Sequence, residues 1–365
     1  MPDRLWPGRL LVGFTVSLVL TGVVMVYSAS SIMAEERFGD TFFFLKRHAV
    51  FALIGIFIML IVAKTDYINI RKIACPALVF IFFLLLILLI PGVGTEVGGA
   101  TRWLRFGPLS FQPSEMAKLA VIFFFAHSFS RKHEEMKDFK KGFLPYITVL
   151  LLFDVPLILQ PDFGTAMTIT GIAMIMLFVA GSRLSYMGIF SAFVAMASYI
   201  LISGAEYRVK RILSFLDPWS DPHNTGFQII QSFLAFGSGG MLGRGLGEGR
   251  QKLFYLPEPH TDFILPVIGE ELGFIGVTAV ILIFAALVIV GIMAALKARE
   301  RFGTYLAIGI TSMIGLQAVI NMGVVMGLLP TKGLTLPFIS YGGTSLVANM
   351  IGVGILASIL ARGES

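Results

Sequence analysis

The sequence is poor in the residues on which most soluble domains depend. Charged residues occupy only 14% of its 365 positions, and a single cysteine, Cys75, is present. Soluble domains average about 25% charged residues, so the composition argues against an ordinary soluble protein. One cysteine also excludes an intramolecular disulfide and a cluster of thiolate metal ligands.

Long apolar runs take the place of the missing charge. Hydrophobic residues make up 56% of the chain and the mean hydropathy is +0.85. A helix needs about 20 apolar residues to cross the hydrocarbon core of a bilayer. Ten such runs lie near residues 10–30, 47–64, 74–91, 114–129, 143–160, 162–181, 185–204, 263–296, 304–328 and 344–361. The sequence therefore predicts an all-α integral membrane protein: one polytopic domain, 1–365, with ten transmembrane helices and a large loop, about 205–262, between spans seven and eight.

The basic residues indicate how such a bundle is oriented. The net charge is +6 and the pI about 9.4, but Lys and Arg are spread over short loops rather than gathered in a groove for nucleic acid. One side of the predicted topology carries Arg4, Arg9, Lys64, Arg71, Lys72, Arg131, Lys132, Lys137, Lys140, Lys141, Arg183, Lys297, Arg299, Arg301 and Arg362; the other carries Arg37, Lys46, Arg47, Arg102, Arg105 and Lys332. The positive-inside rule then predicts cytoplasmic termini and an extracytoplasmic loop 205–262.

Ionisable residues cluster near the predicted outer ends of the spans. An ionisable side chain at membrane depth costs roughly 2.5 to 3.5 kcal/mol, so each is a functional candidate. In "GGATRWLRFGPLSFQPSEMAKL", Arg102 lies in a glycine-rich loop, and Glu115 and Lys118 lie three residues apart on one helix face. The pair is either an internal ion pair that orients the helix or part of a ligand site.

Two further segments place polar residues where a regular helix is interrupted. In "ILQPDFGTAM", Asp162 either caps the following span or lines a wet cavity, and the two roles are compatible. In "LLPTKGLTLPFISYGG", two prolines and three glycines prevent a regular helix, and we expect the segment to fold back into the outer half of the membrane. Its one cation, Lys332, taken singly, is more typical of a lysine that reaches the lipid headgroups.

The predicted outer side thus gathers fixed cations, Arg208 of the long loop among them, around Asp162 and Asp262. Such a set beside lipid suits an anionic headgroup such as a diphosphate. Asp262, in "HTDF" at the mouth of the eighth span, is the candidate general base. A catalytic triad with His260 is improbable because residues two apart do not face each other on a helix, and the spacing required of an H-E-x-x-H metal site is absent.

Six ordered motifs give the chain a family resemblance. "YSASS", "GGATRWL" with "QPSEMAKL", "QPDFGTAM", "QKLFYLPEPHTDF", "GEELGF" and "LLPTKGLTLPFISYGG" resemble the SEDS family (shape, elongation, division and sporulation) over essentially the whole chain. "FFFLKRH", "QKLFYLPE" and "PTKGLTLP" are more similar to its division members than to its elongation members. Where many relatives have an aromatic and small residues after "HTDF", this chain has "ILP", and Pro266 is expected to bend the start of the eighth span.

The resemblance implies a peptidoglycan glycosyltransferase of the bacterial cytoplasmic membrane that polymerises lipid II at the division septum. It implies Asp262 as the catalytic residue, and Arg102, Glu115, Lys118, Asp162 and Lys332 as residues of the substrate cavity. Implied partners are a class B penicillin-binding transpeptidase, other divisome membrane proteins and membrane lipids, with no nucleic acid. Arg and Lys side chains, with a divalent cation (Mg²⁺ or Mn²⁺) bridging the diphosphate, would stabilise the leaving group.

A lipid II flippase is the alternative from a different class, because polar residues that line a bundle suit transport as well. Against transport, the chain has no convincing inverted repeat, and its charged residues concentrate in one half of the predicted membrane rather than at the midplane.

Overall fold

The computed structural model describes residues 6–97, 100–107, 109–204, 206–222, 224, 226–249, 259–331 and 333–363. Within these ranges ten long helices coincide with the ten predicted runs. They are α1 (Trp6–Phe38), α2 (Phe43–Lys64), α3 (Ile70–Ile87), α4 (Pro113–Arg131), α5 (Leu144–Leu159), α6 (Phe163–Val179), α7 (Leu184–Ser203), α10 (Ile264–Leu296), α11 (Arg301–Val325) and α12 (Gly343–Arg362). By length and composition, seven described helices can cross a membrane, and α6 and α7 are shorter apolar helices. The helical bundle is therefore confirmed.

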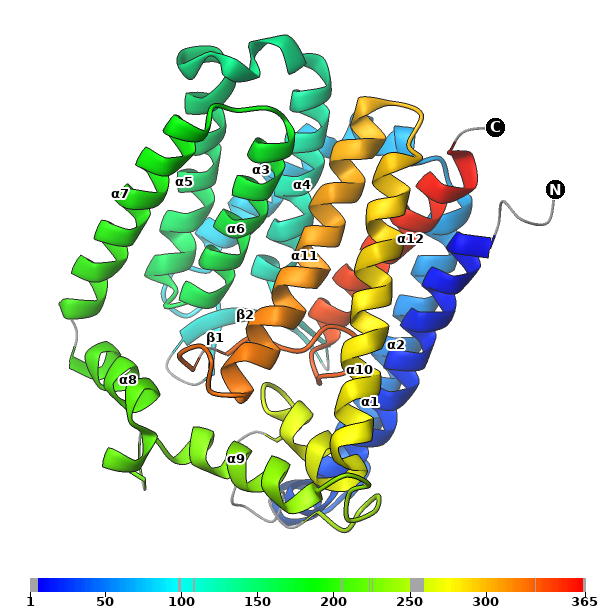
Figure 1. Ribbon diagram of the computed structural model, residues 1–365, viewed down its shortest axis with the longest axis vertical. Coiled ribbons are helices and arrows are strands. Elements are labelled where there is room, and N and C mark those ends of the chain that lie inside the picture. Colours follow the sequence, from blue (N-terminus) through cyan, green and yellow to red (C-terminus); the bar gives the residue numbers. More distant parts are fainter. Residues whose placement is uncertain are drawn as a thin grey trace.

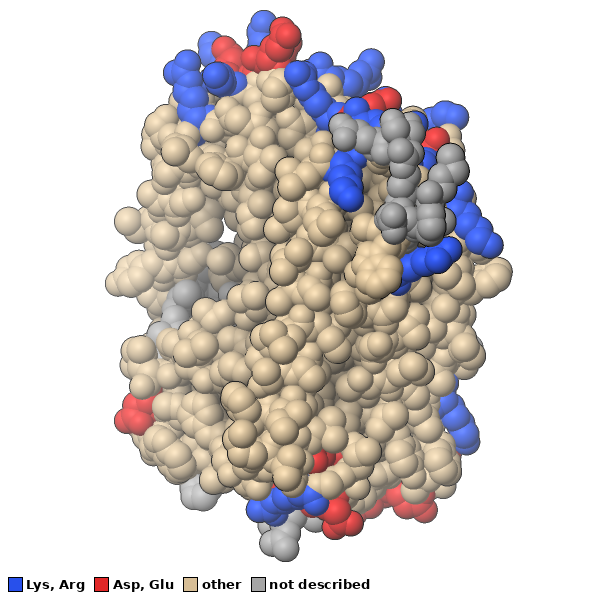
Figure 2. Space-filling model, turned by 45° about the vertical axis from the view of Figure 1, so that its right-hand side comes forward, with Lys and Arg blue, Asp and Glu red and all other residues tan. Residues whose placement is uncertain are grey.

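The two ends of the bundle differ. Both chain termini lie at one end, which we call the terminal face, and the strands, α8 and α9 lie at the other, the loop face (Figure 1). Lys and Arg gather at the terminal face, and a broad band without charged side chains separates it from the mixed charges of the loop face (Figure 2). This distribution is typical of a protein that sits in a bilayer with its basic end on one side.

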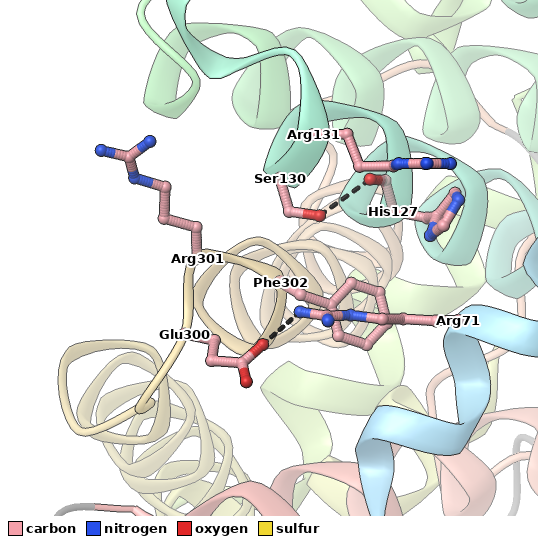
Figure 3. Close-up of a pocket in the computed structure, with 7 residues that line it drawn as sticks. All are labelled: Arg71, His127, Ser130, Arg131, Glu300, Arg301 and Phe302. Atoms are coloured by element: carbon pink, nitrogen blue, oxygen red, sulfur yellow. Dashed lines mark hydrogen bonds and ion pairs between the residues drawn. The ribbon is translucent and has the colours of Figure 1, made fainter.

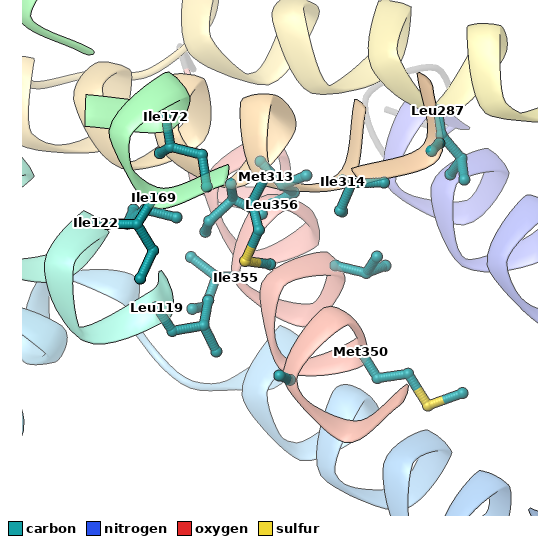
Figure 4. Packing of buried hydrophobic residues seen from close by; sticks show 14 of the residues in the cluster. Leu119, Ile122, Ile169, Ile172, Leu287, Met313, Ile314, Met350, Ile355 and Leu356 are labelled. Carbon is teal, nitrogen blue, oxygen red and sulfur yellow. The ribbon is translucent and has the colours of Figure 1, made fainter. Parts of the chain in front are cut away.

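The core forms where α12 is enclosed by other helices. In the apolar stretch of α12, 83% of the residues are buried, whereas in the apolar stretch that contains α3 only 17% are buried. Leu356 and Ile355 of α12 lie beside Met313 and Ile314 of α11, with Ile122 of α4 nearby (Figure 4). α12 is therefore the centre of the bundle, whereas α3 offers most of its apolar surface to lipid.

The loop face contains elements that the hydropathy of the chain does not predict. A three-stranded antiparallel sheet is formed by β1 (Thr95–Val97), β2 (Ala100–Phe106) and β3 (Leu109–Phe111). The loop between α7 and α10 includes α8 (Glu206–Leu216), a 3₁₀ turn (Pro218–Ser220) and α9 (Phe227–Gly239). At the terminal face the connections contain the short helical turns Tyr67–Asn69, His133–Lys137 and Phe139–Phe143.

α10 is interrupted at Gly273 and not at Pro266. Gly273 has φ 68° and ψ −166°, a conformation that is essentially restricted to glycine. Pro266 lies in the first turn of the helix, where a proline lacks no hydrogen bond, so the predicted bend at that residue is wrong. The break occurs where the loop after α9 crosses the helix: a Cβ on Gly273 would lie 2.3 Å from the backbone nitrogen of Gly243.

Candidate active site

The connection between α11 and α12 is a buried, non-helical segment. Residues 326–331 and 333–342 form no regular helix, yet Leu334, Leu336, Phe338 and Ile339 are at most 3% exposed. Irregular backbone is tolerated at membrane depth only where protein or a wet cavity surrounds it. The segment folds back into the bundle, and its expected place in the outer half of the membrane stays a prediction. We call residues 333–342 the inner segment.

The inner segment holds the "HTD" motif by its backbone. The amide of Tyr341 donates to the carbonyl of His260 at 2.9 Å, and the hydroxyl of Ser340 donates to that of Thr261 at 2.6 Å. The side-chain amide of Asn321, on α11, donates to the carbonyl of Asp262 at 2.9 Å. Three consecutive carbonyls are thus hydrogen-bonded, which fixes the backbone at Asp262.

The carboxyl group of Asp262 lies at the edge of this structure rather than inside it. The residue is only partly buried, and its Oδ2 is so close to Gly333 that a Cβ there would lie 3.1 Å away. α10 begins two residues later, so the positive end of the helix dipole lies next to the carboxylate. A held backbone that carries a carboxylate on a partly exposed residue is the arrangement that a general base requires.

Asp162 and Arg102 meet at the other side of the inner segment. Asp162 caps α6 by accepting a hydrogen bond from the amide of Thr165, which confirms the capping interpretation. Nη1 of Arg102 lies 3.8 Å from Oδ1 of Asp162, and Nη2 donates to the carbonyl of Pro161. A Cβ on Gly164 would lie 3.2 Å from Leu334, so the start of α6 packs against the residue next to Gly333. The inner segment therefore packs against both the start of α6, next to Asp162, and the side chain of Asp262.

Glu115 and Lys118 form a buried pair that supports the inner segment. Nζ of Lys118 lies 2.9 Å from Oε2 of Glu115 and donates to Oε1 of Gln317 at 2.8 Å. The amide nitrogen of Gln317 in turn donates to the carbonyl of Thr335 at 3.0 Å and to the hydroxyl of Ser345 at 3.3 Å. The side chains of Lys118 and Glu115 are 1% and 6% exposed. This geometry favours the orienting pair over direct contact with a ligand.

His260 is a packing residue of the motif. Its ring packs at a tilt against Phe44, with 4.3 Å between ring centroids, and against Tyr341, with 5.5 Å between centroids. Burial, together with the nearby charge of Arg37, lowers the pKa of His260 to about 4, so the imidazole is neutral at pH 7. Among the described residues, no three His, Cys, Asp or Glu side chains come together as a metal site.

The paired acids that follow Asp262 along α10 face inward. Glu270 and Glu271 are 1% and 0% exposed, and the carboxylate of Glu271 accepts hydrogen bonds from Ser28 at 2.7 Å and from the amide of Gly247 at 3.1 Å. The backbone amides of Arg244 and Gly245 donate to the carbonyls of Glu270 and Glu271 at 3.0 Å. The loop after α9 therefore replaces the hydrogen bonds that α10 loses at its break, and its glycines permit this close crossing.

Two predicted site residues cannot be placed in full. Lys332 lies outside the described residues, and of Arg208 only the backbone, in α8, is described. Both assignments remain predictions from the sequence.

Sequence reasoning missed the amides that hold the site together. Gln317 and Asn321 lie four residues apart on α11, on one face of the helix, and both are at most 2% exposed. Polar side chains inside an apolar span are costly unless they are hydrogen-bonded, so their spacing was a usable signal. Ser340 and Ser345 gave no such signal, because serine is common in loops and helix starts.

These features define a polytopic membrane protein with a buried polar network at one face and a partly exposed aspartate, Asp262, at the edge of that network. The chain belongs to the FtsW, RodA and SpoVE family of cell cycle proteins, whose pattern it matches over residues 9–364.

Individual relatives are similar over nearly their full length. A probable peptidoglycan glycosyltransferase FtsW of Geobacter metallireducens is 50% identical over 347 residues, which cover 95% of this chain and 92% of that one. Stage V sporulation protein E of Bacillus subtilis is 45% identical over 97% of this chain and 96% of its own.

Solved structures share the fold. A chain of a peptidoglycan synthase complex, described in terms of coordinated polymerization and crosslinking, superposes with a TM-score of 0.79 at 29% identity, covering 96% of both chains. The rod shape determining protein RodA of Thermus thermophilus gives a TM-score of 0.69 at 26% identity over 96% of this chain and 95% of its own.

Proposed function

We propose that this chain is a peptidoglycan glycosyltransferase that polymerises lipid II, with Asp262 as the general base. The observation that carries the proposal is the geometry of the "HTD" segment: three carbonyls are held by the inner segment and α11, and the residue Asp262 is partly exposed. The names of the relatives support the reaction class.

The reaction requires one proton acceptor and a stabilised leaving group. Asp262 takes the proton from the hydroxyl of the acceptor sugar as that oxygen bonds to the anomeric carbon of the donor. The bond from the anomeric carbon to the diphosphate breaks, and undecaprenyl diphosphate leaves. Arg102, 25% exposed at its side chain and adjacent to the inner segment, contributes positive charge toward the diphosphate. Arg208 and Lys332 are proposed to add to that charge.

One carboxylate is sufficient for this chemistry. A neutralised diphosphate leaves without a separate acid, in contrast to the two carboxylates that glycoside hydrolysis requires. The described residues offer no set of three metal ligands, so we derive no step through a protein-bound metal. A divalent cation, Mg²⁺ or Mn²⁺, would be held by the oxygens of the diphosphate itself.

The setting of the reaction follows from the same reasoning. We place the terminal face in the cytoplasm and the loop face outside the bacterial inner membrane, because Lys and Arg concentrate at the terminal face (Figure 2). A class B penicillin-binding transpeptidase is the proposed partner, supported by the fold shared with a chain of a peptidoglycan synthase complex. The similarity to FtsW proteins supports a place in the divisome at the septum.

The proposal is tested with the purified full-length chain and lipid II alone. Proteoliposomes that contain the chain and fluorescent lipid II should yield glycan strands of several lengths on a gel. Movement of lipid II between leaflets without strand formation would instead establish the flippase alternative. The absence of both, in protein that binds lipid II, would refute either activity for the isolated chain.

A further inference from the structure

A cavity opens at the terminal face, at the opposite end of the bundle from Asp262. Its volume is about 430 Å³, and the start of α3, the end of α4 and the start of α11 enclose it. That volume lies in the range of small-molecule sites, about 300 to 1,000 Å³. The residues that line it are Arg71, His127, Ser130, Arg131, Glu300, Arg301 and Phe302 (Figure 3).

The lining is predominantly cationic. Three arginines and one acid, Glu300, line it, and Glu300 pairs with Arg71, so two positive charges remain unneutralised within the lining. Arg71 lies over the ring of Phe302, with its Cζ 4.7 Å from the centroid, and donates to Glu300 (Figure 3). Phe302 is fully buried and forms an apolar floor that holds the guanidinium in place.

Two buried nitrogen atoms of residues that line this cavity have no hydrogen-bond partner among the described residues. They are Nε of Arg71 and Nδ1 of His127. A buried polar atom without a hydrogen bond costs free energy, and an oxygen acceptor would recover that cost at the N–H of Arg71 once the side chain shifts to expose it. α11 also begins at Arg301, so the positive end of its dipole lies at the same place.

We propose that this cavity binds a phosphate group at the terminal face. The Nη groups of Arg71 offer N–H donors to phosphate oxygens, and Arg131 and Arg301 at the exposed rim attract the anion. Orientation in the membrane accounts for basic residues at this face, but it requires only charge and no cavity of this size lined by three arginines. The proposal does not depend on the proposed glycosyltransferase activity.

Glu300 is the internal competitor of the ligand. Its carboxylate occupies an Nη group of Arg71, and its side chain is 45% exposed, so it can swing away when a phosphate arrives. Removal of this charge and removal of Arg71 should therefore change phosphate affinity in opposite directions. A merely structural ion pair would lose stability with either change and would bind nothing.

The phosphate can come from a lipid headgroup or from solution, and two arms distinguish these sources. The full-length chain is placed in phosphatidylcholine nanodiscs and its unfolding temperature is followed while inorganic phosphate replaces chloride at constant ionic strength. In the second arm the nanodiscs contain increasing fractions of phosphatidylglycerol without added phosphate. A saturable rise in the first arm indicates a soluble phosphate, and a rise in the second alone indicates an anionic lipid.

Variants of the lining residues determine whether the cavity causes the rise in unfolding temperature. Arg71→Gln should weaken the apparent affinity by about tenfold or more, the usual effect of losing a hydrogen bond to a charged group. Glu300→Gln should strengthen it. The double variant Arg131→Gln with Arg301→Gln removes only exposed rim charges and should weaken binding without loss of folding.

The matched control is Lys140→Gln, an exposed lysine near the terminal-face end of α5 that does not line the cavity. It should leave both arms unchanged. Equal weakening by Lys140→Gln and the double rim variant, or no saturable response in either arm, would overturn the proposal. Weaker binding by Glu300→Gln would overturn it too, because the carboxylate could not then be a competitor.

Discussion

Polar residues serve opposite purposes at the two ends of the bundle. At the loop face Lys118, Glu271 and Gln317 are at most 1% exposed, and their hydrogen bonds join segments that are far apart in the sequence. At the terminal face the ion pairs of Arg71 with Glu300 and of Arg362 with Asp66 join side chains that are about a third or more exposed. Surface pairs contribute little to stability, whereas a buried pair is costly to break.

This difference indicates at which face the positions of functional groups must be fixed. A buried hydrogen bond to a carbonyl removes conformational freedom from the backbone, and the inner segment, α11 and the "HTD" motif are joined by several such bonds. Exposed arginines change rotamers at little cost and suit the attraction of an anion. The proposed general base at the loop face needs a rigid backbone. The proposed phosphate site at the terminal face needs charged side chains that can move.

The largest effect is expected from Asp262→Asn. Asparagine is nearly isosteric but cannot accept the proton, so polymerisation should fall by about 10² to 10⁴-fold, the usual contribution of general-base catalysis. Folding and lipid II binding should remain, because no cavity is opened. Near wild-type strand synthesis by the purified variant would refute the assignment and turn attention to Asp162.

The next largest effect concerns the buried pair of Glu115 and Lys118. Reversal of either charge alone should destabilise the protein by about 3 to 5 kcal/mol, because one charge is left buried and unpaired. The double variant Glu115→Lys with Lys118→Glu should retain more stability and more activity than either single reversal. Unfolding temperatures measure the stability and polymerisation rates measure the activity. A double variant that is no more stable and no more active than the single variants would contradict the role of Glu115 and Lys118 as an orienting pair.

Arg102→Ala should have a smaller effect on activity. Loss of a charge that contacts the diphosphate in ground and transition state should weaken lipid II binding and kcat/KM together, by about tenfold or more. Direct binding to lipid II in nanodiscs measures the first quantity. Unchanged affinity would remove Arg102 from the substrate site.

The smallest effect is expected at the terminal face, from Asp66→Asn. Nε of Arg362 lies 4.0 Å from Oδ1 of Asp66, and both side chains are about a third or more exposed. Asparagine can still accept the hydrogen bond that Asp66 receives from Ile68, so stability should change by less than about 1 kcal/mol. A loss as large as that of the Glu115 reversal would break the contrast between the two faces.

The spans and the tertiary contacts differ in how far the sequence predicts them. All ten runs are helices, because an apolar run long enough for a bilayer has no other way to satisfy its backbone. Nine of them have both ends within four residues of the predicted bounds, whereas α1 continues eight residues further, to Phe38. The break at Gly273 could not be predicted, since it depends on the loop around Gly243 that crosses α10. Nor could the bond from Asn321 to Asp262, which joins residues 59 positions apart. The local sequence pattern predicts where helices form, whereas contacts between distant residues determine where a helix breaks and how the site is held.

The central claim is that the buried network acts by holding Asp262, and a double-mutant cycle tests it most directly. Asn321→Leu removes the bond to the carbonyl of Asp262 and should reduce polymerisation by on the order of 10²-fold through misplacement of the carboxylate. In the Asp262→Asn background, where no base remains to be positioned, the same substitution should cost little further activity in long single-turnover incubations. Losses that multiply in the double variant would contradict the account, because Asn321 would then act independently of Asp262.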